Sequence, residues 1–401
     1  MKLLMVTREQ IGEERFGIGR SLAALCNGLR DNGCVVECLT RASLQAEKNA
    51  LLQSETDAAT QRLSYLGLKR QPDLLALITG VVGVGRTAAR LALQQGIDLL
   101  HVHDVALACG IAQIVEEFGA EAASLRWGLT KHSFGCIASA LHQHVMPVQS
   151  FLQQRIREWE RQQLALTRWV CIPTHAGLKQ LADDLGIEPS AHWKVLPHPR
   201  PKINRYDRII ARRLLGWSLD EYRVLGVGMY LPVKRFDRLI QVCAGFGPEL
   251  KLTLVGDGNA DSLRWHAKQS GLGNRLELAT TDDIGLYLSG ADLYVSTSYS
   301  ESFGLANLEA MIAGLPSIVS PVAAVPEVIG NAALQVNPDG PTLEKAIKRV
   351  RDEASLRNHL RLKACARAKA WPDAKDIAKR LMQMINDGDP NPPVRKKRCD
   401  H

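Results

Sequence analysis

Short apolar runs alternate along the chain with longer segments in which apolar residues recur at every third or fourth position. Bounded apolar runs of about 4–8 residues are typical of strands buried in a parallel sheet, and the longer spacing is typical of amphipathic helices. In the first half, this pattern predicts strands at Lys2–Thr7, Val35–Thr40, Leu99–His103 and Val170–Pro173. It predicts helices at about Arg20–Asn32, Leu107–Glu117 and Ala176–Leu185.

The same pattern begins again near Tyr222. It predicts strands at Val224–Val227, Lys251–Val255 and Asp292–Thr297, and helices at Phe236–Gly245, Asp261–Ser270 and about Ala374–Ile385. Strands that alternate with helices indicate an α/β fold with parallel sheets. The proline cluster Pro197-His-Pro-Arg-Pro201 lies between the halves and suits a hinge. We therefore expect two doubly wound domains that face each other across a cleft.

Length and composition are those of a soluble globular protein with two domains. The chain has 401 residues, of which 46% are hydrophobic and 23% charged. The first six residues run straight into a polar loop, so we expect no signal peptide, and the longest apolar stretch, Leu74–Val84, is too short to span a bilayer. The nine cysteines include no Cys-x-x-Cys pair, which favours reduced thiols in the cytoplasm over disulfides or zinc.

The net charge of +8 is distributed unevenly. Residues 345–369 contain nine Lys or Arg against two acids, and Arg395-Lys-Lys-Arg398 lies in a Pro-rich tail, residues 388–401, that we expect to be disordered. Basic surfaces attract nucleic acid, anionic lipid and acidic ligands alike, and a solvated helix face also explains residues 345–369. Because aromatic residues make up only 5% of the chain, no nucleic-acid partner is predicted.

The segment Glu301-Ser-Phe-Gly-Leu-Ala-Asn-Leu-Glu309 carries the most functional information. Its two carboxylates stand eight residues apart. In a continuous helix they would lie about 12 Å apart along the axis, whereas the paired carboxylates of glycosidases lie about 5–9.5 Å apart. We therefore expect Glu301 in a loop and Glu309 in a helix, holding different parts of one elongated ligand. A capped surface helix with ordinary acidic residues is the alternative.

The helix in this segment would begin near Phe303-Gly304-Leu305, where free backbone N–H groups and the positive end of the helix dipole favour an anion. With these residues between its carboxylates, the segment resembles the Glu-x7-Glu motif of the family 4 glycosyltransferases. The resemblance is strong over residues 222–330 and looser over residues 1–200. It implies a GT-B fold, that is, two Rossmann-like domains around a central cleft.

The resemblance also implies how the domains are divided. Residues 1–198 would form the acceptor-side domain and residues 199–371 the domain that binds the nucleotide sugar, with a C-terminal helix at about 372–387 packed back on the first domain. Such an enzyme retains anomeric configuration while it moves a sugar from a nucleotide diphosphate sugar to a glycan, lipopolysaccharide or lipid-linked acceptor. Same-face attack, assisted by the leaving phosphate, is the favoured route because no carboxylate can be placed behind the anomeric carbon.

Lys234, in the loop Val227-Gly-Met-Tyr-Leu-Pro-Val-Lys234, matches the family lysine that clamps the donor diphosphate. The arginine that the family carries in this loop is replaced by Met229. A metal-free site needs a second cation for a diphosphate, and Arg235 is the candidate that we name for it. No metal or other cofactor is expected, because the chain lacks an Asp-x-Asp motif placed to bind one. A non-catalytic nucleotide-sugar binder, suggested by Met229, remains the alternative function.

Two glycine-containing turns match family loops near the donor. Gly17 and Gly19, in Phe16-Gly-Ile-Gly-Arg-Ser21, match a loop that faces donor phosphate and acceptor, and Gly256 matches a turn that approaches the nucleotide. Simple turns are the alternative in both places. Leu22 stands where a dinucleotide fingerprint requires its third glycine, which argues against an oxidoreductase.

Two histidines follow predicted strand ends. His132 matches the family histidine that meets the donor sugar, and His103 matches one that lines the acceptor side of the cleft. Packed core histidines are the alternative, and a zinc site formed with His101 lacks a completing ligand. By the same match, Glu301, Phe303, Gly304 and Leu305 would hold the donor sugar and Glu309 the ribose.

The acceptor side offers one further feature. The apolar run Leu74–Val84, followed by Arg86 and Arg90, suggests an amphipathic basic patch that touches the inner membrane surface. A buried helix is the alternative. Together these observations predict a cytoplasmic enzyme, peripheral on the inner membrane, of the kind that builds cell-envelope polysaccharide.

Overall fold

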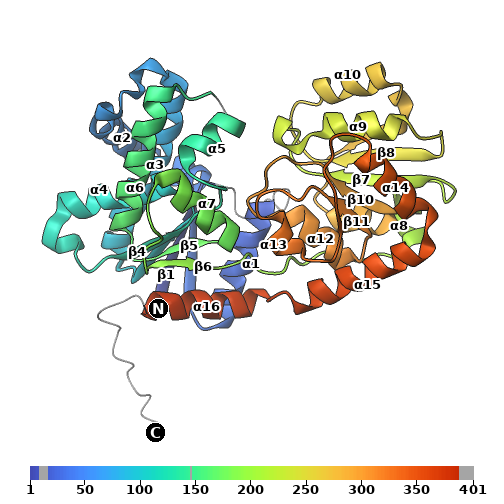
Figure 1. Cartoon of the computed structure of the whole chain (residues 1–401). Helices are drawn as coiled ribbons and strands as arrows, with labels where there is room; N and C mark the ends of the chain where they lie inside the picture. Colours follow the sequence, from blue (N-terminus) through green and yellow to red (C-terminus); the bar gives the residue numbers. More distant parts are fainter. Residues whose placement is uncertain (9–16, 145–146, 388–401) are drawn as a thin grey trace, which may run out of the picture.

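The computed structural model describes residues 1–8, 17–144 and 147–387, and the predicted disordered tail lies outside these ranges. Two α/β halves lie side by side, each built on a six-stranded sheet (Figure 1). All strand pairs in the first sheet are parallel, in the order β2-β1-β3-β4-β5-β6. Its strands are β1 (Lys2–Thr7), β2 (Val35–Thr40), β3 (Leu99–Val102), β4 (Arg126–Thr130), β5 (Val170–Ile172) and β6 (Trp193–Val195).

The second sheet is also parallel throughout, in the order β12-β11-β10-β7-β8-β9. Its strands are β7 (Tyr222–Val227), β8 (Leu250–Val255), β9 (Leu276–Ala279), β10 (Leu293–Ser296), β11 (Ser317–Val319) and β12 (Leu334–Gln335). In both sheets, successive strands are first added on one side of the first strand of the half (β1 or β7), and later strands are added on its other side. In open parallel sheets, ligands bind beside such a switch point, outside the carboxyl ends of the strands.

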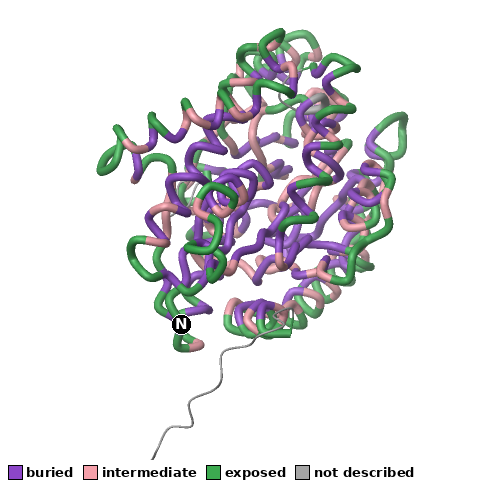
Figure 2. Tube along the Cα trace, turned by 90° about the vertical axis from the view of Figure 1, so that its left-hand side faces the viewer, coloured by how far each residue is buried: buried purple, intermediate pink, exposed green. Residues whose placement is uncertain are grey.

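Helices cover both sheets and leave the central strands largely buried (Figure 2). The first half contains α1 (Gly17–Asp31), α2 (Arg41–Arg62), α3 (Pro72–Gln95), α4 (Val105–Phe118), α5 (Ile137–His144), α6 (Ser150–Leu166) and α7 (His175–Leu185). The second half contains α8 (Arg208–Leu215), α9 (Phe236–Ala244), α10 (Asp261–Ser270), α11 (Ile284–Gly290), α12 (Leu305–Ala313), α13 (Val325–Ile329), α14 (Thr342–Asp352) and α15 (Ala354–Ala370).

The predicted strands and helices are present with end shifts of a few residues. The apolar pattern missed the short strands β6, β9, β11 and β12, which have three, four, three and two residues. Strands β6, β9 and β12 form sheet edges, where partly exposed positions interrupt the apolar run. Strands this short carry too few residues to establish a period.

The prediction of an amphipathic basic surface patch at Leu74–Val84 with Arg86 and Arg90 is wrong. These residues belong to α3, the one described helix long and apolar enough to cross a membrane, and 78% of its most apolar window is buried inside the protein. The Arg86 side chain is only 2% exposed and contacts Glu55 and Glu117. The helix is therefore a core element of the first half, in agreement with the alternative prediction of a buried helix.

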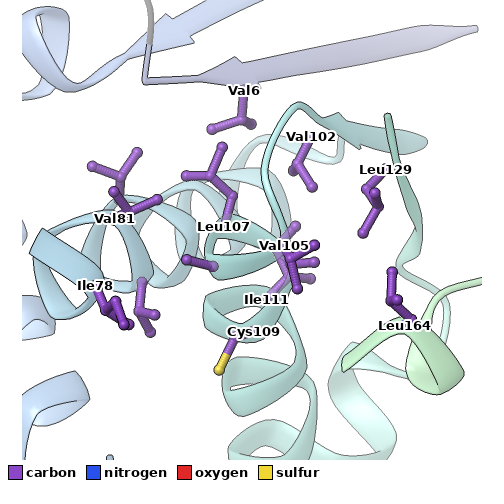
Figure 3. Close-up of a cluster of buried hydrophobic side chains, with 14 of the residues drawn as sticks. Val6, Ile78, Val81, Val102, Val105, Leu107, Cys109, Ile111, Leu129 and Leu164 are labelled. Carbon is purple, nitrogen blue, oxygen red and sulfur yellow. The ribbon is translucent and has the colours of Figure 1, made fainter. Parts of the chain in front are cut away.

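The packing of α3 on α4 fills the space under the first sheet. Ile78 and Val81 of α3 lie beside Leu107 of α4 in one apolar cluster, with Val6 of β1 and Val102 of β3 above them (Figure 3). The two helices approach closely because glycines face each other across the contact. A Cβ atom at Gly85 would lie 2.1 Å from the Leu107 carbonyl oxygen, closer than any real contact.

The last helix, α16 (Ala374–Asp387), returns from the second half to the first (Figure 1). Ile377, Leu381 and Ile385 share an apolar cluster with Leu25 and Leu29 of α1. At the crossing, the Arg200 N–H donates to the Pro372 carbonyl at 2.9 Å, and the Trp371 indole donates to the His198 carbonyl at 2.9 Å. The chain thus passes twice between the halves, and the two crossing segments are hydrogen-bonded to each other.

Candidate active site

A cavity of about 490 Å³ lies between the two halves. Its wall from the first half consists of the start of α1 together with His132, and the hinge contributes His198. The second half contributes the loops after β7, β8 and β10 and the start of α12. The cavity is therefore closed by segments that follow strand ends, as expected for a ligand site in this architecture.

Glu301 and Lys234 form an ion pair in this cavity. The Lys234 Nζ lies 2.5 Å from Glu301 Oε1, and the Ser298 hydroxyl donates to the same carboxylate oxygen at 3.0 Å. The Thr297 hydroxyl donates to the carbonyl of Lys234 at 2.8 Å, which fixes the lysine loop against the end of β10. Both charged side chains are mostly buried, at 19% and 14% exposure, so their pairing is only weakly screened by water.

Glu309 lies inside α12, one turn beyond its first residue, Leu305. The structure thus confirms that Glu301 belongs to a loop and Glu309 to a helix. The Glu309 side chain is 2% exposed, and Arg20 of α1 donates to its Oε1 at 2.6 Å. Burial raises the pKa of this carboxyl, and the Arg20 guanidinium opposes the rise. The two halves therefore share an ion pair across the cavity.

The starts of α1 and α12 meet beside this pair. A Cβ atom at Gly17 would lie 3.0 Å from Leu305 Cδ1, so the start of α1 packs directly against the first residue of α12. The first N–H groups of an α-helix have no partner within the helix, and its N-terminus carries a partial positive charge. Two such ends in one cavity favour an anionic ligand group.

Two histidines, His132 and His198, line the cavity, and His103 lies behind His132. The His132 ring stacks on the His198 ring with centroids 5.2 Å apart, and the edge of His198 meets Phe303 at 4.7 Å. The Nδ1 atom of His103 lies 2.9 Å from the Nε2 atom of His132, so that one ring donates and the other accepts. The Ser21 hydroxyl lies 2.8 Å from His198 Nδ1.

Burial lowers the pKa of these rings. The pKa values of His103 and His132 lie well below the ordinary value, and that of His198 is about 4. Desolvation disfavours the charged imidazolium. All three rings are therefore neutral at neutral pH, and they offer hydrogen-bonding and stacking surface rather than positive charge.

Pairing accounts for four of the five charged groups that line the cavity in the described part of the chain. Arg20 is paired with Glu309 and Lys234 with Glu301, and the third carboxylate is Asp257. Asp257 accepts the N–H of Gly258 at 2.7 Å in the turn after β8. Within the described residues, no group of three or more His, Cys, Asp or Glu side chains is arranged to hold a metal ion.

Two family models cover most of the chain. The model described as Glycosyltransferase Family 4 matches residues 17–200, and the model described as Glycosyl transferases group 1 matches residues 207–367. This chain belongs to glycosyltransferase family 4. The family suggested by the Glu301–Glu309 segment is thereby confirmed.

Curated relatives of this family 4 glycosyltransferase match over part of their length. N-acetyl-alpha-D-glucosaminyl L-malate synthase of Bacillus anthracis is 32% identical over 151 residues, which are 36% of this chain and 40% of that protein. D-inositol 3-phosphate glycosyltransferase of Mycobacterium sp. (strain KMS) is 28% identical over 155 residues, 36% of this chain and 35% of that protein. The matched part spans less than half of these curated relatives.

Two solved structures align over nearly the full length of the chain. Sucrose-phosphate synthase from Thermosynechococcus elongatus aligns with a TM-score of 0.72 at 18% identity, over 96% of this chain and 99% of that chain. Anabaena HepE, in complex with UDP-glucose, aligns with a TM-score of 0.69 at 17% identity, over 96% and 100%. Identities this low show the fold alone, and they confirm the predicted GT-B architecture.

The predicted site residues of this family 4 glycosyltransferase fall into two groups. Nine line the cavity: Gly17, His132, Lys234, Gly256, Glu301, Phe303, Gly304, Leu305 and Glu309. Gly19, His103 and Arg235 do not line it. Gly19 is buried inside α1. His103 lies behind His132 and therefore does not line the cavity, contrary to the prediction.

Arg235 points away from the cavity. Its guanidinium lies 3.2 Å from Asp339 and 3.7 Å from Asp237, and its backbone has a φ of 50°, which turns the chain into α9. The idea that Arg235 supplies the second positive charge therefore has no geometric support here.

Sequence reasoning missed Arg20 and His198. Arg20 stands three residues after Gly17, in a segment whose pattern predicts only its glycines as site residues. His198 stands in the proline cluster whose pattern predicts a hinge. In both cases the residue type suits a site, yet nothing in the local pattern says that its side chain faces the cavity.

Proposed function

We propose that this protein transfers a sugar from a nucleotide diphosphate sugar to an acceptor hydroxyl, with retention of anomeric configuration and without a metal ion. One observation carries this proposal: Lys234–Glu301, Glu309 and two helix N-termini surround a single cavity between two Rossmann-like halves. HepE, which shares the fold, was solved with UDP-glucose, and this supports a nucleotide-sugar donor.

In this proposal, Glu309 accepts hydrogen bonds from the ribose hydroxyls. Lys234 and the N-termini of α1 and α12 neutralise the diphosphate as it leaves, in place of a divalent metal. Glu301 and the backbone of residues 303–305 hold the sugar hydroxyls, and His132 contacts the sugar from the other half. A neutral His132 suits this contact, because its ring can donate to or accept from a hydroxyl group.

Same-face attack fits the state of the carboxylates. The oxygen of the acceptor hydroxyl bonds to the anomeric carbon while the bond from that carbon to the phosphate oxygen breaks, and the proton passes to the leaving phosphate. Glu301 is paired with Lys234, and Glu309 is buried against Arg20. A paired or inaccessible carboxylate is a poor nucleophile, so a covalent intermediate on either residue is disfavoured.

A second hollow, of about 500 Å³, supports a glycan as acceptor. It lies between α5 and α7 of the first half and the residues next to Glu301 in the second half. Its wall contains two aromatic rings, Phe134 and Tyr299, and polar groups that suit sugar hydroxyls: Ser300, Ser139, Gln180, Asp183 and Asp184. WaaG, which shares the fold, is described as involved in lipopolysaccharide biosynthesis. We therefore propose a glycan, lipopolysaccharide or lipid-linked acceptor, used on the cytoplasmic side of the inner membrane.

The first test is a thermal-shift screen of the purified protein with UDP, GDP and ADP in the presence of EDTA. The matching nucleotide, at about 100 times its Kd, adds about 2.7 kcal/mol to the free energy of unfolding. Lys234→Ala is expected to remove this stabilisation and to lower kcat/KM by roughly 10²–10³-fold. Retention is then read from the anomeric signals of the product by NMR.

Three outcomes separate the alternatives. Binding together with transfer supports the proposal, and binding without any transfer or donor hydrolysis supports the non-catalytic binder. If no nucleoside diphosphate shifts the melting temperature, both the transferase and the non-catalytic nucleotide-sugar binder are excluded. A requirement for added Mg²⁺ or Mn²⁺ would overturn the metal-free mechanism alone.

A further inference from the structure

The ion pair between Arg20 and Glu309 joins the two halves across the cavity. We propose that donor binding exchanges this pair: the ribose hydroxyls take over Glu309, and the released Arg20 guanidinium binds the donor diphosphate. Arg20 is then the second diphosphate cation of this site, supplied by the first half. This inference rests on the proposed function, and it goes further by naming a binding residue and a switch of partners.

Burial explains why the pair exists before a ligand binds. The Glu309 side chain is 2% exposed inside α12, and a buried carboxylate without a partner is strongly destabilising. Arg20, at 17% exposure, donates to it at 2.6 Å and still lines the open space of the cavity. Hydroxyl donors from a ribose can replace that hydrogen bond, after which the arginine no longer has to stay beside Glu309.

The distribution of charge points to Arg20 as the diphosphate ligand. Among the residues that the structure describes, Arg20 and Lys234 are the cations that line the cavity, and the loop residue after Gly228 is the uncharged Met229. Arg235 is directed to Asp339 on the outside. A diphosphate carries more charge than Lys234 alone can neutralise, and Lys234 already has a partner in Glu301.

The position of Arg20 on its helix fits this role. Arg20 lies one turn after Gly17, and the start of α1 touches Leu305 at the start of α12. The two helix N-termini and Arg20 thus converge on the same part of the cavity, where an anion is favoured. A guanidinium also suits two phosphate oxygens, because its donors form a planar fork.

The exchange has a consequence for domain closure. A diphosphate held by Lys234 on one half and by Arg20 on the other connects the two halves directly. The next residue, Ser21, is hydrogen-bonded to His198 in the hinge, so α1 is already tied to the segment about which the halves would move. Donor binding therefore strengthens closure at the moment when the sugar must be shielded from water.

The experiment is a calorimetric titration with a nucleoside, its monophosphate and its diphosphate, from the uridine, guanosine or adenosine series that stabilises the wild type. Arg20→Ala is expected to weaken diphosphate binding roughly 10- to 100-fold and to leave nucleoside binding unchanged or tighter, because Glu309 loses its competitor. Adding Met229→Arg to Arg20→Ala should recover most of the lost diphosphate affinity. Arg30→Ala, at the far end of the same helix and exposed, is the matched control.

The outcomes distinguish this inference from the proposed function. If Arg20→Ala weakens nucleoside and diphosphate equally, Arg20 only supports Glu309 and the exchange is wrong. If diphosphate affinity is unchanged in Arg20→Ala but falls in Arg235→Ala, the second cation is Arg235. Should Arg20→Ala fold poorly, Arg20→Gln in the same titration decides, since it keeps a hydrogen-bond donor to Glu309 but no charge. When the wild type binds no diphosphate, the proposed function itself fails.

Discussion

Single residues in this cavity are held in charge states set by their neighbours. Glu309 has a raised pKa because of burial, with Arg20 favouring its charged form. His198 has its pKa lowered to about 4 by burial, and it packs between His132 and Phe303. The cavity therefore contains neutral rings and two ion pairs, and an incoming ligand can exchange the partners of these pairs.

The neutral histidines predict a loss of stability in mild acid. Below about pH 6.5, the unfolded chain binds a proton at each histidine, whereas the fold keeps His198 neutral down to about pH 4. The unfolded state then holds more protons. The free energy of unfolding should therefore fall as the pH drops below about 6.5, by up to about 1.4 kcal/mol per pH unit for each such histidine.

Urea denaturation between about pH 7 and pH 5 measures this slope. His198→Asn removes one neutral buried ring and should flatten the slope. His359→Asn, on the exposed face of α15, is the matched control and should leave the slope as it is. An unchanged slope in His198→Asn would contradict the assignment of a depressed pKa to this ring.

Among secondary-structure elements, α3 and α4 form the most extensive helix contact in the first half, and glycine makes it possible. Cβ atoms at Gly85 and Gly110 would lie 2.1 and 2.2 Å from carbonyl oxygens of the facing helix. Such contacts require the helices to separate or shift. The apolar cluster beneath β1 and β3 depends on that close approach (Figure 3).

Gly85→Ala is accordingly expected to destabilise the protein, although alanine favours a helix. The overpacking should cost about 1–3 kcal/mol or more, against a gain of about 1 kcal/mol in helix propensity. Gly80→Ala in the same helix is the matched control, because its Cβ would meet only the mobile tip of Arg41 at 3.3 Å. Chemical denaturation measures both, and equal stabilities would argue against a rigid α3–α4 contact.

In the whole molecule, a second contact besides Arg20–Glu309 holds the halves together. Glu327 of α13, in the second half, accepts the backbone N–H groups of His175 and Ala176 at 2.9 Å each. These are first-turn groups of α7 in the first half, so the carboxylate caps that helix from the other half. The start of α13 thus also serves the contact between the halves.

Glu327→Ala is expected to open the cleft. Losing the cap should favour the open arrangement by about 0.5–2 kcal/mol, which small-angle scattering would detect as a larger radius of gyration without nucleotide. Saturating nucleoside diphosphate should reverse most of the change. Glu344→Ala, in the first turn of α14 and exposed, is the matched control. If both variants scatter like the wild type, Glu327 does not control closure.

The sequence by itself determined many of the elements and part of the site. The strand Val35–Thr40 follows from an apolar run of neighbouring residues. The transition from loop to helix that separates Glu301 from Glu309 is also decided by residues that are close together in the sequence. The Glu301–Glu309 segment was enough to indicate the family. Local patterns carry this information because strands, helix starts and turns are decided within a few residues.

Only the tertiary structure decided which side chains meet. Arg20 and Glu309 are 289 residues apart in the chain, and Ser21 and His198 are 177 apart. Arg86, next to an apolar run, is buried against Glu55, while Arg235, next to a site lysine, faces outward. The direction of each side chain follows from how the helices and the two halves pack, and spacing along the chain does not contain that packing.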